Sequence, residues 1–174
     1  MSQQTKALFL DRDGVINKEI NYLHKIEDFI FIDGIFELCK KFKTDGYKIF
    51  VVTNQSGICR EYYSEDDFRT LTKWMVEEFK KNSIKIEKVY HCPHHPKFSG
   101  ECECRKPNAG MLLQAEKEFN IDLKNSIIIG DKESDIEAGL NAGLSKTYLF
   151  DEFKKSNSSK ATKVIHSLKE LLSK

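Results

Sequence analysis

Five short apolar runs, rich in β-branched and aromatic residues, recur along the chain and predict β-strands. They lie at residues 7–11, 47–53, 88–92, 126–131 and 146–150. Each run is almost continuously apolar, which is typical of strands that are buried on both faces of a parallel sheet. The runs therefore favour a buried parallel sheet over a sheet with one face in water.

The segments between these runs carry apolar residues at helical spacing. They predict helices over residues 35–46, 64–81, 107–120 and 133–143. The second begins at Ser64 with Asp67 where a capping box usually has Glu or Gln, and the third has Pro107 at its first position. Alternating strands and helices predict an α/β fold, a Rossmann-like three-layer sandwich around a mostly parallel sheet.

The remaining stretches and the composition limit the organisation of the chain. Residues 153–163 are polar and rich in serine and lysine, so we expect a mobile surface loop, followed by a last short strand and helix. The 174 residues suit a single domain, 1–174, and the net charge of +1 offers no basic surface for nucleic acid. No apolar run approaches the roughly 20 residues of a membrane span, and residues 1–11 leave no room for a signal peptide. Five cysteines, three of them in one loop, favour the reducing cytoplasm over disulfide bonds.

Polar side chains follow three of the predicted strands at the point where each strand ends. Asp11 closes the first run and Asp13 follows it, Thr53 ends the second, and Asp131 ends the fourth. Taken singly, these residues have ordinary readings, such as a turn for Asp13 or a helix N-cap for Asp131. Together, at the strand ends where α/β sheets bind ligands, they favour a site. Neighbouring carboxylates repel unless a cation lies between them, and oxygen ligands predict Mg²⁺.

The loop over residues 92–104 combines three cysteines with two histidines. In extended chain, Cys92 and His94 point to one side and His95 to the other, and Cys102 and Cys104 again share a side. Two such pairs facing each other predict a tetrahedral Zn²⁺ site, with His95 as the alternative ligand to His94. Four protein ligands leave no open position, so the metal would be structural. A redox pair of thiols is the weaker alternative because no CxxC is present, and unrelated surface thiols are the simplest one.

Four stretches resemble the motif regions of the haloacid dehalogenase superfamily of phosphohydrolases. They are DRDGVIN (11–17), VVTNQSGI (51–58), CPHHP with CECRKPNAGM (92–96 and 102–111) and IIIGDKESD (127–135). Within the superfamily, the resemblance is greatest to the D-glycero-D-manno-heptose 1,7-bisphosphate 7-phosphatases, whose nearest relatives are histidinol phosphatases, and it covers roughly residues 7–150. It implies a phosphatase that removes the 7-phosphate in nucleotide-activated heptose biosynthesis, of lipopolysaccharide for example.

The resemblance also implies a role for each matching residue. Asp11 is the expected nucleophile that forms an aspartyl-phosphate, and Asp13 the expected general acid and base. Thr53 and Lys106 would bind the transferring phosphoryl group. Magnesium would be held by Asp11, the carbonyl of Asp13, and Asp131, and zinc by Cys92, His94, Cys102 and Cys104. Expected substrate-binding residues are Arg12, Asn54, Gln55, Ser56, Arg105 and Lys132, and Asp135 would orient Lys106 or a metal-bound water.

The expected substrate is a small sugar phosphate, and we expect a monomer without nucleic-acid or membrane partners. No long insertion follows the first or second motif, so we expect a capless fold with the crevice covered by loops 15–30, 55–63 and 92–104. Tyr22 and Tyr63 could stack on either a sugar or an imidazole, so histidinol phosphate is an alternative substrate. The 3′-phosphate of DNA is a further one, against which the balanced charge weighs. An inactive, zinc-stabilised scaffold is the alternative from another class. Cys59-Arg60-Glu61 departs from the commoner Ala-Arg-Gly of the family, which leaves the local loop geometry open.

Overall fold

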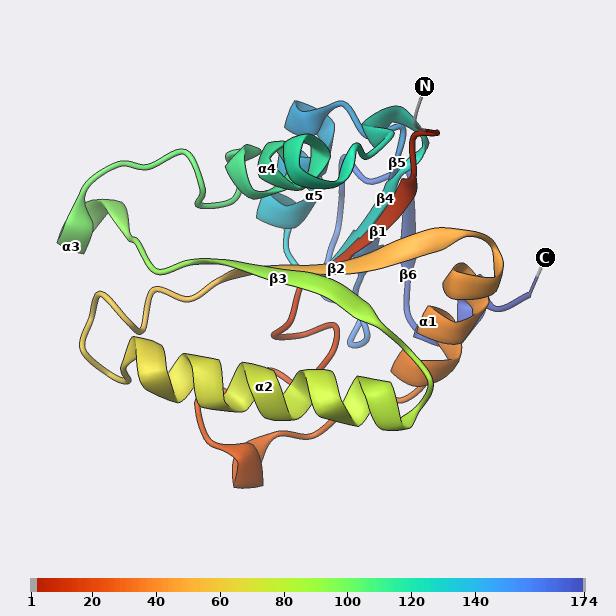
Figure 1. The fold of residues 1–174 in the computed structure, drawn as a ribbon. Helices are drawn as coiled ribbons and strands as arrows, with labels where there is room; N and C mark the ends of the chain where they lie inside the picture. The colour runs from red at the N-terminus through yellow and green to blue at the C-terminus, as the bar shows by residue number, and fades with distance from the viewer. Residues whose placement is uncertain (1–2, 174) are drawn as a thin grey trace.

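The predicted strands assemble into one parallel six-stranded sheet in the computed structural model, which describes residues 3–173 (Figure 1). The strands are β1 (Lys6–Leu10), β2 (Tyr47–Asn54), β3 (Ile86–Cys92), β4 (Ile127–Gly130), β5 (Lys146–Phe150) and β6 (Lys163–Ile165). They lie in the order β3-β2-β1-β4-β5-β6, and each neighbouring pair is parallel. The sheet therefore confirms the α/β prediction.

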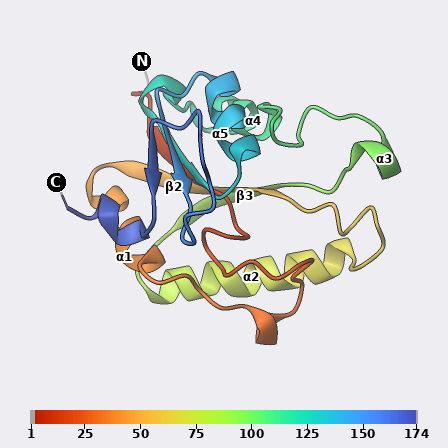
Figure 2. The same ribbon diagram turned by 180° about the vertical axis from the view of Figure 1, so that it is seen from behind.

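Helices cover both faces of this sheet and make three layers (Figures 1 and 2). On one side lie α1 (Ile35–Thr44) and α2 (Glu65–Lys81), and on the other lie α4 (Gly110–Phe119) and α5 (Glu133–Ala142). Side chains alternate along β1, so that Leu8 and Leu10 join the core beneath α1 and α2, whereas Ala7 and Phe9 join the core beneath α4 and α5. The nearly continuous apolar runs in the sequence arise because the central strands contribute side chains to both cores.

The strand order reverses next to β1, and this reversal positions the site. The chain runs from β1 outwards to β2 and β3, then returns to the other side of β1 with β4. Ligands of open α/β sheets bind beyond the carboxyl ends of the strands at such a switch point. The segments that follow β1 and β4 begin with Asp11 and Asp131, so both aspartates reach this crevice.

The third predicted helix begins later than expected. Helix α4 starts at Gly110 instead of Pro107, because the backbone of Lys106 is held by the side chain of Asn54 and Gly110 N–H donates to the carbonyl of Glu103. The short helix α3 (Pro96–Ser99) in the cysteine loop was not predicted. Three 3₁₀ turns complete the elements, namely η1 (Ile26–Asp28), η2 (Leu123–Asn125) and η3 (Leu168–Leu171). The last helix predicted from sequence is thus a 3₁₀ turn.

Other local predictions hold in detail. Ser64 caps α2 and completes a capping box with Asp67 in both directions. The polar segment 153–163 contacts α5, because the Ser159 hydroxyl donates to Glu133 at 2.8 Å and Lys160 pairs with Glu137 at 2.8 Å. Its mobility stays a prediction. Within residues 3–173, no helix combines the length and apolar character that a membrane crossing requires.

Candidate active site and metal centres

The carboxyl ends of three adjacent strands bring together the polar residues that the sequence places there. Asp11 follows β1, Thr53 is the penultimate residue of β2, and Asp131 follows β4. Since β1 lies between β2 and β4, the three side chains reach one edge of the sheet. Asp11 and Thr53 are buried, with 6% and 1% of their surface exposed. The site is therefore built into the core of the fold.

Three carboxylates crowd this edge. Asp11, Asp131 and Asp135 each have an oxygen within 4.8 Å of the others. Burial, reinforced by the charge of Asp135, raises the pKa of Asp11 to about 6, while burial and the charge of Asp11 raise the pKa of Asp131 to about 9. Oδ1 of Asp131 is buried without a hydrogen-bond partner among the described residues. Three adjacent carboxyl groups and an unpartnered oxygen fit a hard divalent cation such as Mg²⁺.

Gly14 lets Asp131 come this close to the first motif. Its φ is +88°, a conformation that only glycine adopts without strain. A Cβ atom at this position would lie 2.2 Å from Oδ2 of Asp131. The turn after Asp13 therefore requires glycine for its backbone angle and for the space beside the carboxylate.

Lys106 supplies the positive charge within the acidic cluster. Its Nζ lies 3.0 Å from Asp11 and 2.6 Å from Asp135, and donates to the Val52 carbonyl at 2.7 Å. Burial alone would lower the pKa of Lys106, but the charges of Asp11 and Asp135 outweigh it and raise that pKa. The ammonium therefore stays charged beside Asp11. Asp135 also accepts from the backbone N–H of Lys132, so both of its oxygens are engaged and it orients Lys106.

Asn54 holds Lys106 from the neighbouring motif. Its side-chain amide donates to the Lys106 carbonyl at 3.2 Å, and its Oδ1 accepts from the Lys106 N–H at 3.1 Å. Asn54 and Gln55 both line the cavity described below, but their amide groups are engaged within the protein. Their predicted contact with substrate stays a prediction, whereas their contacts to other site residues are direct.

The carboxylate of Asp13 is surrounded by donors. Nη2 of Arg12 donates to its two oxygens at 3.0 and 3.2 Å, and Nδ2 of Asn17 donates to Oδ1 at 3.0 Å. Arg12 is 1% exposed and also donates to the carbonyl of Leu23. Arg12 is not among the residues that line the cavity described below, so its predicted contact with substrate stays a prediction. Asn17 was not identified from the sequence, where its only signal is a polar residue after the apolar pair Val15-Ile16.

A cavity of about 460 Å³ opens directly onto Asp11, Asp13 and Lys106. Ser56, Tyr22 and Tyr63 line it, as do the predicted substrate-binding residues Arg105 and Lys132. Nη1 of Arg105 donates to the carbonyl of His94 at 3.1 Å, and Lys132 pairs with Glu19 at 3.2 Å. The cavity thus combines the carboxylates of Asp11 and Asp13 with the cations of Lys106, Arg105 and Lys132, an arrangement suited to a phosphorylated ligand.

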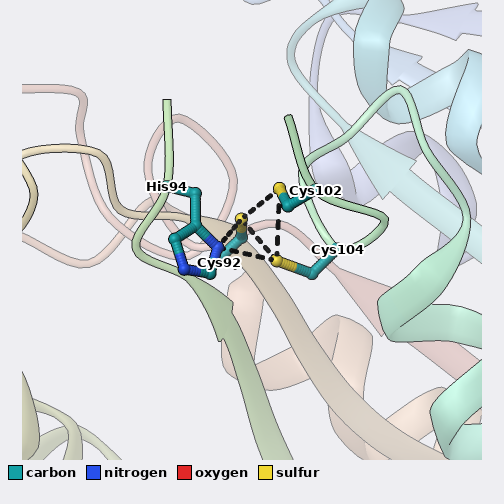
Figure 3. Close-up of side chains that lie close together, drawn as sticks. All are labelled: Cys92, His94, Cys102 and Cys104. Atoms are coloured by element: carbon teal, nitrogen blue, oxygen red, sulfur yellow. Dashed lines mark hydrogen bonds between the residues drawn. The ribbon is translucent and has the colours of Figure 1, made fainter. Parts of the chain in front are cut away.

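The cysteine loop forms a second candidate metal centre at the end of β3 (Figure 3). Sulfurs of Cys92, Cys102 and Cys104 and Nδ1 of His94 converge on one point. Four of the contacts measure 3.5–3.8 Å, close to the roughly 3.8 Å edge of a tetrahedron with Zn–S bonds of about 2.3 Å. The Cys92–Cys104 contact is shorter, at 2.6 Å. All five cysteines of the chain are free.

The other residues of the loop agree with this ligand set. His95 points elsewhere, since its Nδ1 accepts from the Lys97 N–H at the start of α3. Burial raises the pKa of the Cys92 thiol, and burial also raises that of Cys104. Thiols held this close can bind one shared cation as thiolates, with their protons released to solvent. The geometry therefore favours His94 over His95 and a metal over a redox pair.

Comparison with known proteins assigns the chain to a family. The HAD-hydrolase-like family model matches residues 103–171. The D-glycero-alpha-D-manno-heptose-1,7-bisphosphate 7-phosphatase of Campylobacter jejuni is 59% identical over 152 residues, which cover 87% of this chain and 86% of that protein. The chain belongs to the haloacid dehalogenase superfamily of phosphohydrolases.

Other superfamily members support the fold and place the chain among similar enzymes. A D-glycero-beta-D-manno-heptose-1,7-bisphosphate 7-phosphatase of Haemophilus influenzae is 48% identical, covering 79% of this chain and 77% of its own. The crystal structure of D,D-heptose 1,7-bisphosphate phosphatase from B. bronchiseptica, with magnesium and phosphate, aligns with a TM-score of 0.84 at 24% identity and covers 96% of each chain. This likeness shows a shared haloacid dehalogenase fold.

The departure from the superfamily's commoner Ala-Arg-Gly has a local structural consequence. Glu61 stands where the glycine is usual, and its φ is +61°, in the left-handed region. The loop therefore keeps a turn that glycine would adopt more easily, at a cost of roughly 1 kcal/mol. Cys59, in the same loop, directs its Sγ to the Ser56 carbonyl at 3.2 Å.

Proposed function

We propose that this chain is a Mg²⁺-dependent phosphatase that removes the 7-phosphate of D-glycero-D-manno-heptose 1,7-bisphosphate through an aspartyl-phosphate. The observation that carries the proposal is the 59% identity to a phosphatase of this name, in a chain whose Asp11 lines the cavity beside Lys106 and lies within 4.8 Å of Asp131. The product would enter nucleotide-activated heptose biosynthesis. The reaction is the hydrolysis of a phosphoric monoester.

The first half of the reaction transfers the phosphoryl group to the protein. The carboxylate of Asp11 attacks phosphorus, and the P–O bond to the sugar breaks with its electron pair passing to the sugar oxygen. Asp13 gives that oxygen its proton. Lys106, fixed 3.0 Å from Asp11, neutralises the phosphoryl oxygens, and the Thr53 hydroxyl donates to another.

The second half returns Asp11 to its free state. Asp13, now ionised, takes a proton from the attacking water, which cleaves the aspartyl-phosphate and releases inorganic phosphate. Asp11, Asp131 and the carbonyl of Asp13 would hold Mg²⁺, which supplies positive charge to the phosphoryl oxygens. Asp135 keeps Lys106 in place through its contact of 2.6 Å.

The walls of the cavity recognise the rest of the substrate. Arg105 is placed to bind the second phosphate of a bisphosphate, because its guanidinium lines the cavity beside Lys106. Relatives named for the alpha anomer are 49–59% identical to this chain, and those named for the beta anomer are 41–48% identical. These identities support the alpha anomer as the preferred substrate.

The cysteine loop holds a structural Zn²⁺ in this proposal. Its four ligands leave no position for a catalytic water, and Arg105 follows Cys104 directly. The metal would therefore fix the segment that presents Arg105 and Lys106. We further propose a single capless domain over residues 1–174 that acts as a monomer in the cytoplasm, without nucleic-acid or membrane partners.

The test is phosphate release from both heptose 1,7-bisphosphate anomers, histidinol phosphate and a 3′-phosphorylated oligonucleotide. Each assay is run with Mg²⁺, after dialysis against Mg²⁺-free buffer, and with Asp11→Asn. Preference for the alpha anomer that requires Mg²⁺ and Asp11 is the expected result. Preference for histidinol phosphate would overturn the substrate, and absence of turnover would favour the inactive scaffold.

A further inference from the structure

A chain of hydrogen bonds connects a buried tyrosine to the acid and base of the site. The hydroxyl of Tyr63 donates to Oε1 of Gln55. Nε2 of Gln55 donates to Oδ2 of Asp13 at 3.0 Å and to Oγ1 of Thr53 at 2.9 Å. The Gln55 amide can therefore take only one orientation, because turning it over would set its oxygen against the Asp13 carboxylate and its NH₂ group against the tyrosine.

Packing from two loops fixes the tyrosine itself. The ring of Tyr63 stacks on that of His24, with centroids 5.2 Å apart and planes 12° apart. Gly57 lies against the same ring, since a Cβ atom there would come within 2.2 Å of Cε1 of Tyr63. Tyr63 is 7% exposed. The position of its hydroxyl is thus fixed by packing against the segments that follow β1 and β2.

The hydrogen bonds of the Asp13 carboxylate show what the contact from Gln55 adds. Asn17 and Arg12 bind Oδ1, and Oδ2 meets Arg12 at 3.2 Å and Gln55 at 3.0 Å. Gln55 is the donor to Oδ2 that comes from a distant part of the sequence, the segment directly after β2. Without it, the hydrogen bonds of residues 3–173 that oppose rotation of the carboxylate about its Cβ–Cγ bond come only from Arg12 and Asn17, which are close to Asp13 in sequence.

We propose that Tyr63 and Gln55 are positioning residues that hold the Asp13 carboxyl group at the angle required for proton transfer to the leaving sugar oxygen. Tyr63 acts through Gln55 and touches no reacting atom. The inference rests on the proposed function, in which Asp13 is the general acid. Because Gln55 also donates to Thr53, that hydroxyl directs its own proton away from the amide, towards the phosphoryl group.

The leaving group distinguishes positioning from a general structural effect. A sugar alkoxide is a poor leaving group and needs the proton of Asp13 as the P–O bond breaks, whereas p-nitrophenolate leaves without one. The ratio kcat/KM reports the steps up to this cleavage, before water attacks the aspartyl-phosphate. Misplacing Asp13 should therefore lower kcat/KM for the sugar phosphate much more than for p-nitrophenyl phosphate.

The experiment compares Tyr63→Phe, Gln55→Met and the double variant with Mg²⁺ present. General acid catalysis contributes roughly 10²–10⁴-fold, so we expect Tyr63→Phe to lower kcat/KM about tenfold more for heptose 1,7-bisphosphate than for p-nitrophenyl phosphate. The double variant should match Gln55→Met, because Tyr63 acts only through that amide. The matched control is Tyr62→Phe, the neighbouring tyrosine with 54% exposure, which should leave the ratio of the two substrates unchanged.

Equal losses on both substrates would overturn the inference, and so would additive losses in the double variant. His24→Ala provides a second route, because it frees the Tyr63 ring without removing a polar contact to Asp13, and it should change the substrate ratio in the same direction. If the wild type hydrolyses p-nitrophenyl phosphate but no heptose bisphosphate, the proposed substrate fails. The inference is then tested with β-glycerophosphate as the alkyl ester.

Discussion

Replacing Asp131 by asparagine should stabilise the Mg²⁺-free protein while abolishing its activity. The side chain keeps its size but can no longer ionise, and it therefore needs no bound proton to lie within 4.8 Å of Asp11 and Asp135. The new amide can also donate to Asp11, which a carboxylate can do only when it is protonated. The free energy of unfolding without Mg²⁺ should therefore rise.

Two routes give the magnitude. An ionised Asp131, with its oxygen at most 4.8 Å from that of Asp11, would be repelled by about 3 kcal/mol or more at an effective dielectric constant of about 20, which is the cost that retaining the proton avoids. A pKa of about 9 for Asp131 in the folded protein, against an ordinary value of 3.8, means that folding at pH 7 retains a proton at a cost of about 4 kcal/mol. We expect Asp131→Asn to gain about 2–4 kcal/mol, or roughly 6–12 °C in Tm.

The sign of the pH dependence follows from the same pKa values. The folded pKa values of Asp11 and Asp131 lie above 3.8, so the folded wild type holds protons that the unfolded chain has released. Wild-type stability therefore falls as pH rises from about 4 towards about 9. The advantage of Asp131→Asn should be near zero at pH 4 and grow through pH 7.

The assay is urea unfolding at pH 4, 5.5, 7 and 8.5 after dialysis against Mg²⁺-free buffer, without a chelator that would strip the cysteine loop. Asp28→Asn, a substitution of the same kind at an exposed position, is the control and should change stability by less than about 0.5 kcal/mol. Added Mg²⁺ should stabilise the wild type but not Asp131→Asn. A variant that is less stable than the wild type at pH 7, or a difference independent of pH, would refute the reasoning.

Three further substitutions test other parts of the site and fold. Lys106→Met leaves Asp11 and Asp135 without their shared partner, so the free energy of unfolding should fall by about 3–5 kcal/mol and kcat/KM by at least about 10²-fold. Retained activity would exclude the proposed role of Lys106 in binding the phosphoryl group. Cys104→Ser should reduce the zinc content found by metal analysis and lower Tm. It should also raise KM for heptose bisphosphate more than for p-nitrophenyl phosphate, because Arg105 adjoins the loop. Unchanged zinc content would contradict the ligand set. Ser64→Ala removes the cap of α2 and should cost about 0.5–2 kcal/mol in urea unfolding with full activity, whereas no loss would show that the capping box contributes little.

Several contacts of the site join residues that are distant in sequence, and no local pattern predicts them. Asn54 holds the backbone of Lys106, 52 residues away, and Gln55 reaches Asp13 across 42 residues. Arg12 shows that the position of a residue within a motif does not predict where its side chain points. Its place between Asp11 and Asp13 predicts contact with substrate, but its side chain is buried and donates to Asp13 and to the Leu23 carbonyl.

The sequence by itself determined the elements and the ends of the strands. Apolar runs specified β1, β2 and β4 because strands buried on both faces must be apolar throughout, and the polar residue that ends a run marks the crevice. The i, i+2 spacing of Cys92 with His94 and of Cys102 with Cys104 likewise put each ligand pair on one face. Only the tertiary structure decided which side chains face the cavity and which brace their neighbours, because that choice depends on packing between segments that sequence periodicity does not relate.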